Sequence, residues 1–225
     1  PGGRVWTADE LRRLGDICVR HGVIVVSDEI HHDLVFAPHK HVPFASLGQE
    51  YAERSVTCIA PSKTFNLAGL QAAASIVPNG ELRRKFLHTA RQGLSVHMDS
   101  YFGVTGLEAS YRYGEPWLEQ LLVYLRENRD ALIAFLEERL PELRVMKPEA
   151  TYLAWVDCRA ISEDPAEMKK LMFREACVAF SEGSVFGEKG AGWLRINFGC
   201  PRAVLLEALE RFAEAARRRL DARKS

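Results

Sequence analysis

The chain has 225 residues, of which 47% are hydrophobic and 27% charged, so it can bury the core of one large domain or of two smaller ones. Its formal net charge is zero, which excludes a global field that would draw nucleic acid or an anionic membrane to it. No apolar run reaches the length of a transmembrane helix, no signal-peptide pattern opens the chain, and the five cysteines form no C-x-x-C pair, so we expect a cytoplasmic protein with neither a membrane nor a nucleic-acid partner.

Alternating helices and short strands are expected in the first third of the chain. Residues 7–10, Thr-Ala-Asp-Glu, form a capping box that opens a helix, and Gly22 is placed to end it. The β-branched run at residues 23–26 predicts a parallel strand buried on both faces. Further along, the pattern predicts a His-rich loop at 31–44, a short helix near 47–54, and strands at 55–59 and 72–77.

Helices dominate the middle of the chain, and a smaller mixed region follows. Helices are expected at residues 81–93, 100–113 and 115–140, and Pro141 ends the last of them. Beyond them, strands are expected at 143–146, 151–157 and 193–198, helices at 164–177 and 201–220, and a glycine-rich loop at 183–192. The sequence therefore predicts an α/β fold: residues 1–126 belong to a large domain with a helix-flanked mixed or parallel sheet, and residues 127–225 form a small α+β domain.

Two of the expected strands lead into ionisable residues. Asp28 follows the first strand, and Lys63 follows the second. Because ligands bind outside the carboxyl ends of the strands in open α/β sheets, we expect both side chains to face one crevice. Pyridoxal phosphate chemistry needs a lysine that holds the cofactor as a Schiff base and a carboxylate that pairs with its pyridinium nitrogen. Taken singly, each residue has a simpler interpretation, namely a solvated loop lysine and a turn-forming aspartate.

The whole pattern resembles a known family more closely than any single residue does. The segments that carry the resemblance are Ser27-Asp28-Glu29-Ile30-His31, Ser62-Lys63-Thr64-Phe65-Asn66, Thr151-Tyr152-Leu153-Ala154-Trp155 and Asn197-Phe198-Gly199-Cys200-Pro201-Arg202. The chain resembles the fold-type I pyridoxal phosphate enzymes of the class I and II aminotransferase superfamily, and within them the bacterial cystathionine β-lyase, or C–S lyase, branch. The resemblance extends over essentially the whole chain in the family's order.

The resemblance implies a role for each of five residues. Lys63 would bind the cofactor and act as the catalytic base, and Asp28 would pair with the pyridinium nitrogen. Arg195 would grip the substrate α-carboxylate with its planar fork. His31 stands where aminotransferases carry a tyrosine that bonds the cofactor, which fits the lyase branch. Ser62 is a candidate to bond the cofactor phosphate.

Three departures from the family pattern limit this match. Ala60 and Gln71 stand where the wider family commonly has a serine and an arginine that hold the phosphate, although Gln71 can still donate hydrogen bonds. Residues 1–3, Pro-Gly-Gly, resemble the tail of the family's Asn-Pro-x-Asn-Pro-x-Gly loop. The ring-binding asparagine and the glycine-rich phosphate turn would then precede the chain. The chain is therefore expected to be the C-terminal portion of an enzyme, with part of the large domain lacking, and to be inactive alone.

The resemblance implies a lyase that cleaves the Cβ–S bond of cystathionine, cysteine or a related S-substituted amino acid to pyruvate, ammonia and a thiol. It also implies a homodimer with the site at the subunit interface. Two alternatives stay open, an aminotransferase and a non-catalytic fragment that keeps the fold.

A metal-dependent hydrolase is a rival interpretation of the histidines. The potential ligands are Asp28, His31, His32, Asp33, His39 and His41. Their spacing matches no closed metal site, so we expect that the protein binds no metal here.

Overall fold

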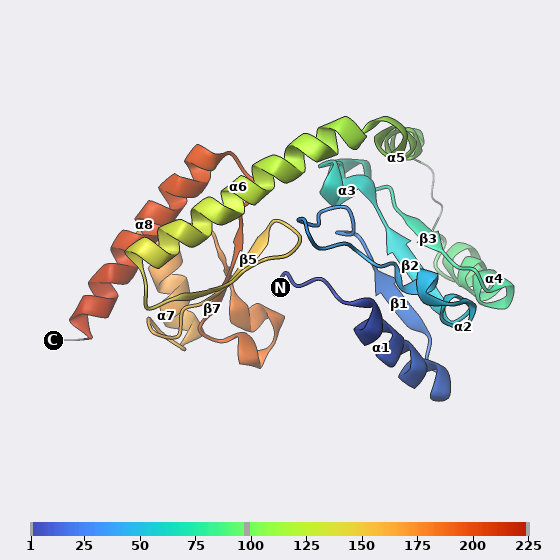
Figure 1. The fold of residues 1–225 in the computed structure, drawn as a ribbon, viewed down its shortest axis with the longest axis horizontal. Coiled ribbons are helices and arrows are strands. Elements are labelled where there is room, and N and C mark those ends of the chain that lie inside the picture. Colours follow the sequence, from blue (N-terminus) through green and yellow to red (C-terminus); the bar gives the residue numbers. More distant parts are fainter. Residues whose placement is uncertain (1, 97–99, 224–225) are drawn as a thin grey trace. The chain divides into compact units, whose positions relative to one another are not determined.

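The computed structural model describes residues 2–96 and 100–223, and the chain forms two compact units (Figure 1). One unit runs from Val5 to Gln120, and the other joins the short stretch before Val5 to the chain from Leu121 onward. The division falls inside one long helix, α6 (Glu115–Arg139). The domain boundary expected after residue 126 therefore stays a prediction. Pro1, the first residue of the expected match to the family loop, lies outside the described residues.

A mixed sheet of three strands, in the order β1-β2-β3, organises the first unit. β1 (Val25–Asp28) runs parallel to β2 (Ser55–Ile59), and β3 (Ala74–Ile76) runs antiparallel to β2. The register pairs Asp28 with Cys58, so the carboxyl ends of the two parallel strands lie side by side. The α/β class expected from the sequence is confirmed, and β2 has the bounds that the sequence predicted.

The first strand differs from its prediction in position and in burial. Gly22 adopts φ +66° and ends α1 (Ala8–Arg20), and the N–H of Val23 donates to Cys18 O at 2.8 Å. This hydrogen bond, which spans six residues from Cys18 to Val23, completes a Schellman motif at the C-terminus of the helix. Val23 therefore belongs to the helix end, and β1 begins two residues later. Burial on both faces was wrong for the described chain: successive side chains of β1 alternate between half-buried and exposed, and Val26 is 68% exposed.

The helices of the first unit follow the expected order. α1 opens with the capping box, in which Thr7 Oγ1 accepts from Glu10 N at 3.3 Å and Glu10 Oε2 accepts from Thr7 N at 2.9 Å. The other α-helices are α2 (Gln49–Ala52), α3 (Pro61–Thr64), α4 (Gly80–His88) and α5 (Tyr101–Tyr113). The predicted helix at 81–93 continues beyond α4 as a π-helical turn, Thr89–Gly93.

The second unit is an antiparallel sheet of order β4-β5-β7-β6 with helices packed against it. The strands are β4 (Arg144–Met146), β5 (Leu153–Asp157), β6 (Ser181–Glu182) and β7 (Trp193–Asn197), and the helices besides α6 are α7 (Pro165–Lys170) and α8 (Arg202–Ala222). The expected helix at 164–177 continues past α7 as a π-helical turn, and β6 was not predicted because two residues give no periodic signal. None of the described helices is both long enough and apolar enough to cross a bilayer.

Asn128 ties α6 to the segment that follows β7. Its side chain is fully buried, and Nδ2 donates to Phe198 O at 3.0 Å and to Cys200 O at 2.8 Å. Its Oδ1 accepts from Arg202 Nε at 3.0 Å. One amide therefore satisfies two carbonyl groups and one guanidinium at the end of the strand that carries Arg195.

Replacing Asn128 with Ala should lower the free energy of unfolding by about 2–4 kcal/mol, because the two carbonyls lose their donor. Urea denaturation of the chain measures the change. Glu127→Gln, which affects the partly exposed ion pair with Arg202, is the control and should cost less than about 1 kcal/mol. Equal losses for the two variants would contradict this account of Asn128.

Candidate active site

Lys63 lies on a single helical turn directly beyond β2. Pro61 occupies the first turn of α3, where its fixed φ suits a helix, and Ala60 offers no side-chain cap. The N–H of Phe65 donates to Pro61 O at 2.8 Å, and Asn66 then takes φ +55°. The side chain of Lys63 is exposed. The turn thus presents the amine at the carboxyl end of the parallel pair of strands.

Asp28 is the last residue of β1 rather than the first residue after it. Its side chain is exposed, and Oδ1 accepts from Ile30 N at 3.3 Å, which forms a small turn. Because Asp28 pairs in register with Cys58, its carboxylate leaves the sheet at the edge where the Lys63 turn begins. The expectation that the two strand ends share one edge is met within the first unit.

His31 lies near the charged side chains of Lys63 and Asp28. Its ring is half-buried, and burial lowers its pKa below the ordinary value of 6.5. The positive charge of Lys63 lowers the pKa further, and the negative charge of Asp28 opposes this by raising it. The imidazole is therefore neutral at pH 7 and lies within electrostatic reach of both groups. The structure places Lys63 and Asp28 within electrostatic reach of His31, and the roles of the three residues toward a cofactor stay predictions.

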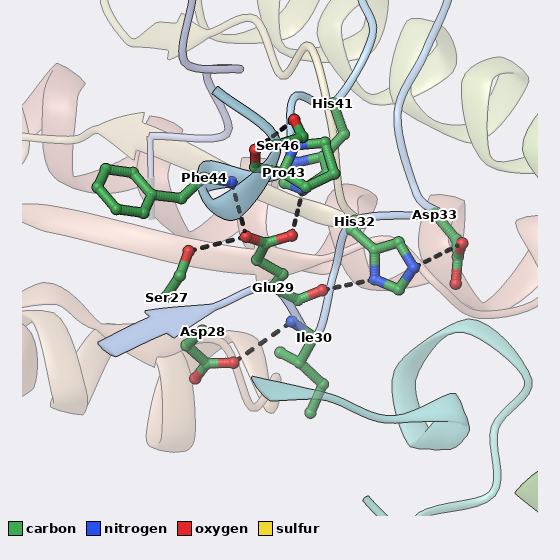
Figure 2. Close-up of polar contacts among 10 residues, drawn as sticks. All are labelled: Ser27, Asp28, Glu29, Ile30, His32, Asp33, His41, Pro43, Phe44 and Ser46. Carbon is green, nitrogen blue, oxygen red and sulfur yellow. Dashed lines mark hydrogen bonds and ion pairs between the residues drawn. The ribbon is translucent and has the colours of Figure 1, made fainter. Parts of the chain in front are cut away.

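Glu29 is a buried carboxylate behind this edge (Figure 2). Its Oε1 accepts from Ser27 Oγ at 2.9 Å and from Phe44 N at 3.1 Å, and Oε2 lies 2.8 Å from His41 Nε2. Burial acts to raise the pKa of Glu29, but the hydrogen bonds from His41, Phe44 and Ser27 bring it below the ordinary value. Glu29 is thus ionised, and it anchors the His-rich loop to the end of β1.

A second set of polar contacts joins that loop to the Lys63 turn (Figure 2 shows its His32 and Asp33 portion). His32 Nδ1 lies 2.7 Å from Glu29 O, and His32 Nε2 lies 3.0 Å from Asp33 Oδ1. The other oxygen of Asp33 accepts from Thr64 Oγ1 at 2.9 Å. Sequence reasoning missed Asp33 and Thr64 as a pair, since 31 residues separate them.

The same contacts give the histidines a role other than metal binding. His32 and His41 each bond to a carboxylate, as just described. Among residues 2–96 and 100–223, no group of three or more His, Cys, Asp or Glu side chains is arranged to hold a metal ion. The geometry thus lends the metal-dependent hydrolase no support.

Arg195 lies on β7, in the second unit. Its Nη2 donates to Ser181 Oγ at 3.2 Å, and its guanidinium carbon lies 4.6 Å from the centre of the Phe186 ring. Burial raises the pKa of Tyr152, and the nearby charge of Arg195 opposes that rise. The bond to Ser181 uses one of the five N–H groups of the guanidinium, which leaves donors for an anionic ligand.

The two candidate phosphate-binding residues have different settings. Ser62 lies in α3 directly before Lys63 and is half-exposed. Gln71 caps a short 3-10 turn, Ala68–Leu70, in a left-handed conformation with φ +52°. Ala60, which departs from the family's serine, is 4% exposed. The role of Ser62 toward a phosphate stays a prediction.

Comparison with known proteins finds one family. The model of the family described as aminotransferase class I and II matches residues 1–212. Cystathionine beta-lyase PatB of Bacillus subtilis is 44% identical over 215 residues, and protein MalY of Escherichia coli is 36% identical over 220 residues. Each match covers 96% of this chain and 55% of the relative, so the chain spans about half the length of the curated relatives it matches.

A solved structure gives the same result for the fold. Cystalysin from Treponema denticola, which contains a pyridoxal 5′-phosphate cofactor, superposes with a TM-score of 0.92 at 35% identity. The match covers 96% of this chain and 55% of cystalysin.

The opposing effects on His31 provide a test of the site's geometry. Replacing Lys63 with Met removes a positive charge, so the pKa of His31 should rise toward 6.5. Replacing Asp28 with Asn removes the negative charge, so the pKa should fall further. Exchange of the ring C2 proton, followed by mass spectrometry over a pH series, measures both shifts. Lys85→Met, which removes an exposed lysine paired with Glu81, should leave His31 unchanged.

Proposed function

The chain belongs to the class I and II aminotransferase family, and on that premise we propose that the whole protein is a pyridoxal 5′-phosphate-dependent carbon–sulfur β-lyase. It converts cystathionine, cysteine or a related S-substituted amino acid, with water, to pyruvate, ammonia and the corresponding thiol. The observation that carries the proposal is the placement of Lys63 and Asp28 at the shared carboxyl end of β1 and β2.

The residues at this edge fit the cofactor. When bound, pyridoxal phosphate supplies an electron sink for the negative charge that develops at the substrate Cα. Lys63 holds the cofactor and then, as a free amine, takes the Cα proton as general base. Asp28 pairs with the ring nitrogen and keeps it protonated. His31 is neutral, so it can hydrogen-bond at this edge without adding a charge that competes with Asp28.

The remaining roles concern the substrate and the phosphate. Arg195 binds the substrate α-carboxylate through two parallel N–H groups. The single ammonium group of a lysine cannot make this bidentate contact. Its position over the Phe186 ring favours one orientation of the guanidinium plane. Ser62 contributes its hydroxyl to the cofactor phosphate. We further propose a cytoplasmic homodimer with the active site at the subunit interface, as the resemblance implies.

An aminotransferase is the alternative within the family, and it is less supported because the curated relatives described above include a protein named as a cystathionine β-lyase. Both chemistries share the removal of the Cα proton, so Lys63 and Asp28 cannot distinguish them. They differ in whether a thiol leaves Cβ or a keto acid is needed to complete the cycle.

The test is to incubate the whole protein with cystathionine and pyridoxal phosphate, without any keto acid. We expect release of pyruvate and ammonia over many turnovers, and we expect Lys63→Ala to abolish it. Pyruvate is measured with a coupled dehydrogenase, and ammonia independently. Lys85→Ala is the matched control for an exposed lysine. A single turnover that resumes only when a keto acid is added would establish the aminotransferase instead.

Replacing Arg195 with Lys should lower kcat/KM for α-amino acids by roughly 10- to 100-fold, the equivalent of about 1.5–3 kcal/mol, because the charge stays while the fork is lost. Steady-state kinetics with cystathionine measures the effect. Arg211→Lys, at a surface pair with Glu207, is the control. An unchanged kcat/KM would make Arg195 a structural arginine of β7.

A further inference from the structure

The turn that carries Lys63 has little local support. α3 is only four residues long, and no side chain caps its N-terminus. An isolated turn of this length is unstable, since one or two backbone hydrogen bonds do not offset the ordering of its residues. The position of the Lys63 amine therefore depends on contacts from outside the turn.

Thr64 provides such a contact on the buried side of the turn. It is 0% exposed, and its hydroxyl donates to Asp33 Oδ2 at 2.9 Å. Asp33 belongs to the loop that leaves β1, whereas Thr64 follows directly after Lys63 in the chain. The bond therefore fastens the lysine's turn to the neighbouring strand's loop.

His32 holds Asp33 in place from the other side (Figure 2). Both partners of its ring are acceptors: the backbone oxygen of Glu29 at Nδ1 and the carboxylate of Asp33 at Nε2. A neutral imidazole has one N–H and can satisfy only one of them. Both bonds form together only when the ring carries two protons, so this geometry selects the imidazolium form of His32.

We propose that His32, Asp33 and Thr64 form a positioning relay for Lys63, and that the relay is complete only while His32 carries both ring protons. The proposal rests on the proposed function only in making Lys63 the reactive amine. None of the three residues of the relay is assigned contact with the cofactor or substrate, so each acts through the position of the turn.

The charges around His32 support the doubly protonated ring. The hydrogen bond that the His32 ring donates to Asp33 raises the pKa of His32 above 6.5 against the opposing effect of burial, and the charge of Glu29 adds to the rise. Burial acts to raise the pKa of Asp33, but His32 and Thr64 together bring it below 3.8. Two other titratable side chains lie near the ring. The ring centre of His41 lies 5.8 Å from that of His32, and the ring of Tyr111 stacks at 6.4 Å between centres. Burial raises the pKa of Tyr111 to about 12.

These shifts fix the sign of the pH dependence. Because the pKa of His32 is raised in the folded state, protonation of its ring stabilises that state. This stabilisation is fully present below about pH 6.5 and is lost as the pH rises through the raised pKa. The lowered pKa of Asp33 makes its contribution present above 3.8 and lost as the pH falls through the lowered value. The relay is therefore complete at mildly acid pH and opens as the pH rises through the raised pKa of His32.

The test follows backbone hydrogen exchange in the segment 61–67 of the whole protein by mass spectrometry. Thr64→Val keeps the shape of the side chain but removes the hydroxyl, and should speed exchange of this segment about tenfold, as expected for a lost hydrogen bond to a charged group. Thr64→Ser keeps the hydroxyl and should restore the slow rate. Pyridoxal phosphate attachment to Lys63, followed by absorbance, should slow in Thr64→Val by a similar factor.

Thr57→Val is the matched control, because Thr57 is also buried on the neighbouring β2 and its hydroxyl has no hydrogen-bond partner among the described residues. It should change neither exchange nor attachment. Exchange in Thr64→Val equal to that in Thr57→Val would overturn the relay. If wild type does not attach the cofactor at Lys63, the proposed function fails, while the exchange comparison still decides the relay.

A second measurement needs no substitution at Thr64. In wild type, exchange of segment 61–67, corrected for its intrinsic pH dependence, should accelerate over the pH range in which the His32 ring loses a proton. Exchange of the ring C2 proton reports that range. In His32→Gln the corrected rate should be fast and independent of pH. A wild-type rate with no change across the His32 titration would refute the protonated relay.

Discussion

The parallel pairing of β1 with β2 is the constraint on which the candidate site depends. Parallel strands send their carboxyl ends to one edge, and the register Asp28 to Cys58 brings the two strand ends level. The first unit's part of the candidate site then follows from what leaves those ends: a carboxylate and a histidine from β1, and a lysine on an uncapped four-residue turn from β2. A change of register by one residue would reverse the side that each of these side chains faces.

Two neighbouring histidines at this edge of the sheet have pKa shifts in opposite directions. His31 and His32 are adjacent in sequence, yet burial and the charge of Lys63 lower the pKa of His31, whereas the hydrogen bond that its ring donates to Asp33 raises the pKa of His32. One ring is neutral and the other cationic at the same pH. The neutral ring lies within electrostatic reach of Lys63 and Asp28, and the carboxylates of Asp33 and Glu29 compensate the charge of the cationic ring. Such a separation follows from surroundings and not from residue type.

The sequence predicted those parts of the molecule that local signals determine. The capping box at Thr7, the bounds of β2 and the strand-end positions of Lys63 and Asp28 are all readable from short segments. The start of β1 was not, because Val23 takes part in a Schellman helix end. The exposure of Val26 depends on what packs over its face of the sheet, and a run of apolar residues carries no such information. The hydrogen bond from Thr64 to Asp33 could not be predicted from the sequence either. The two residues are separated by 31 positions, and only the folded chain brings them into contact.

The connection between β1 and β2 also bears on how the site assembles during folding. The capping box of α1 joins residues three apart and can form early, whereas the contact between Asp33 and Thr64 must await closure of a long loop. The free-energy cost of closing a flexible loop grows slowly, by about 0.6 kcal/mol for each doubling of its length. The exposed stretch at residues 37–40 can therefore lengthen or shorten at small thermodynamic cost, provided that the anchors on either side of it remain. Evolution can thus vary the length of this exposed stretch independently of the turn that carries Lys63.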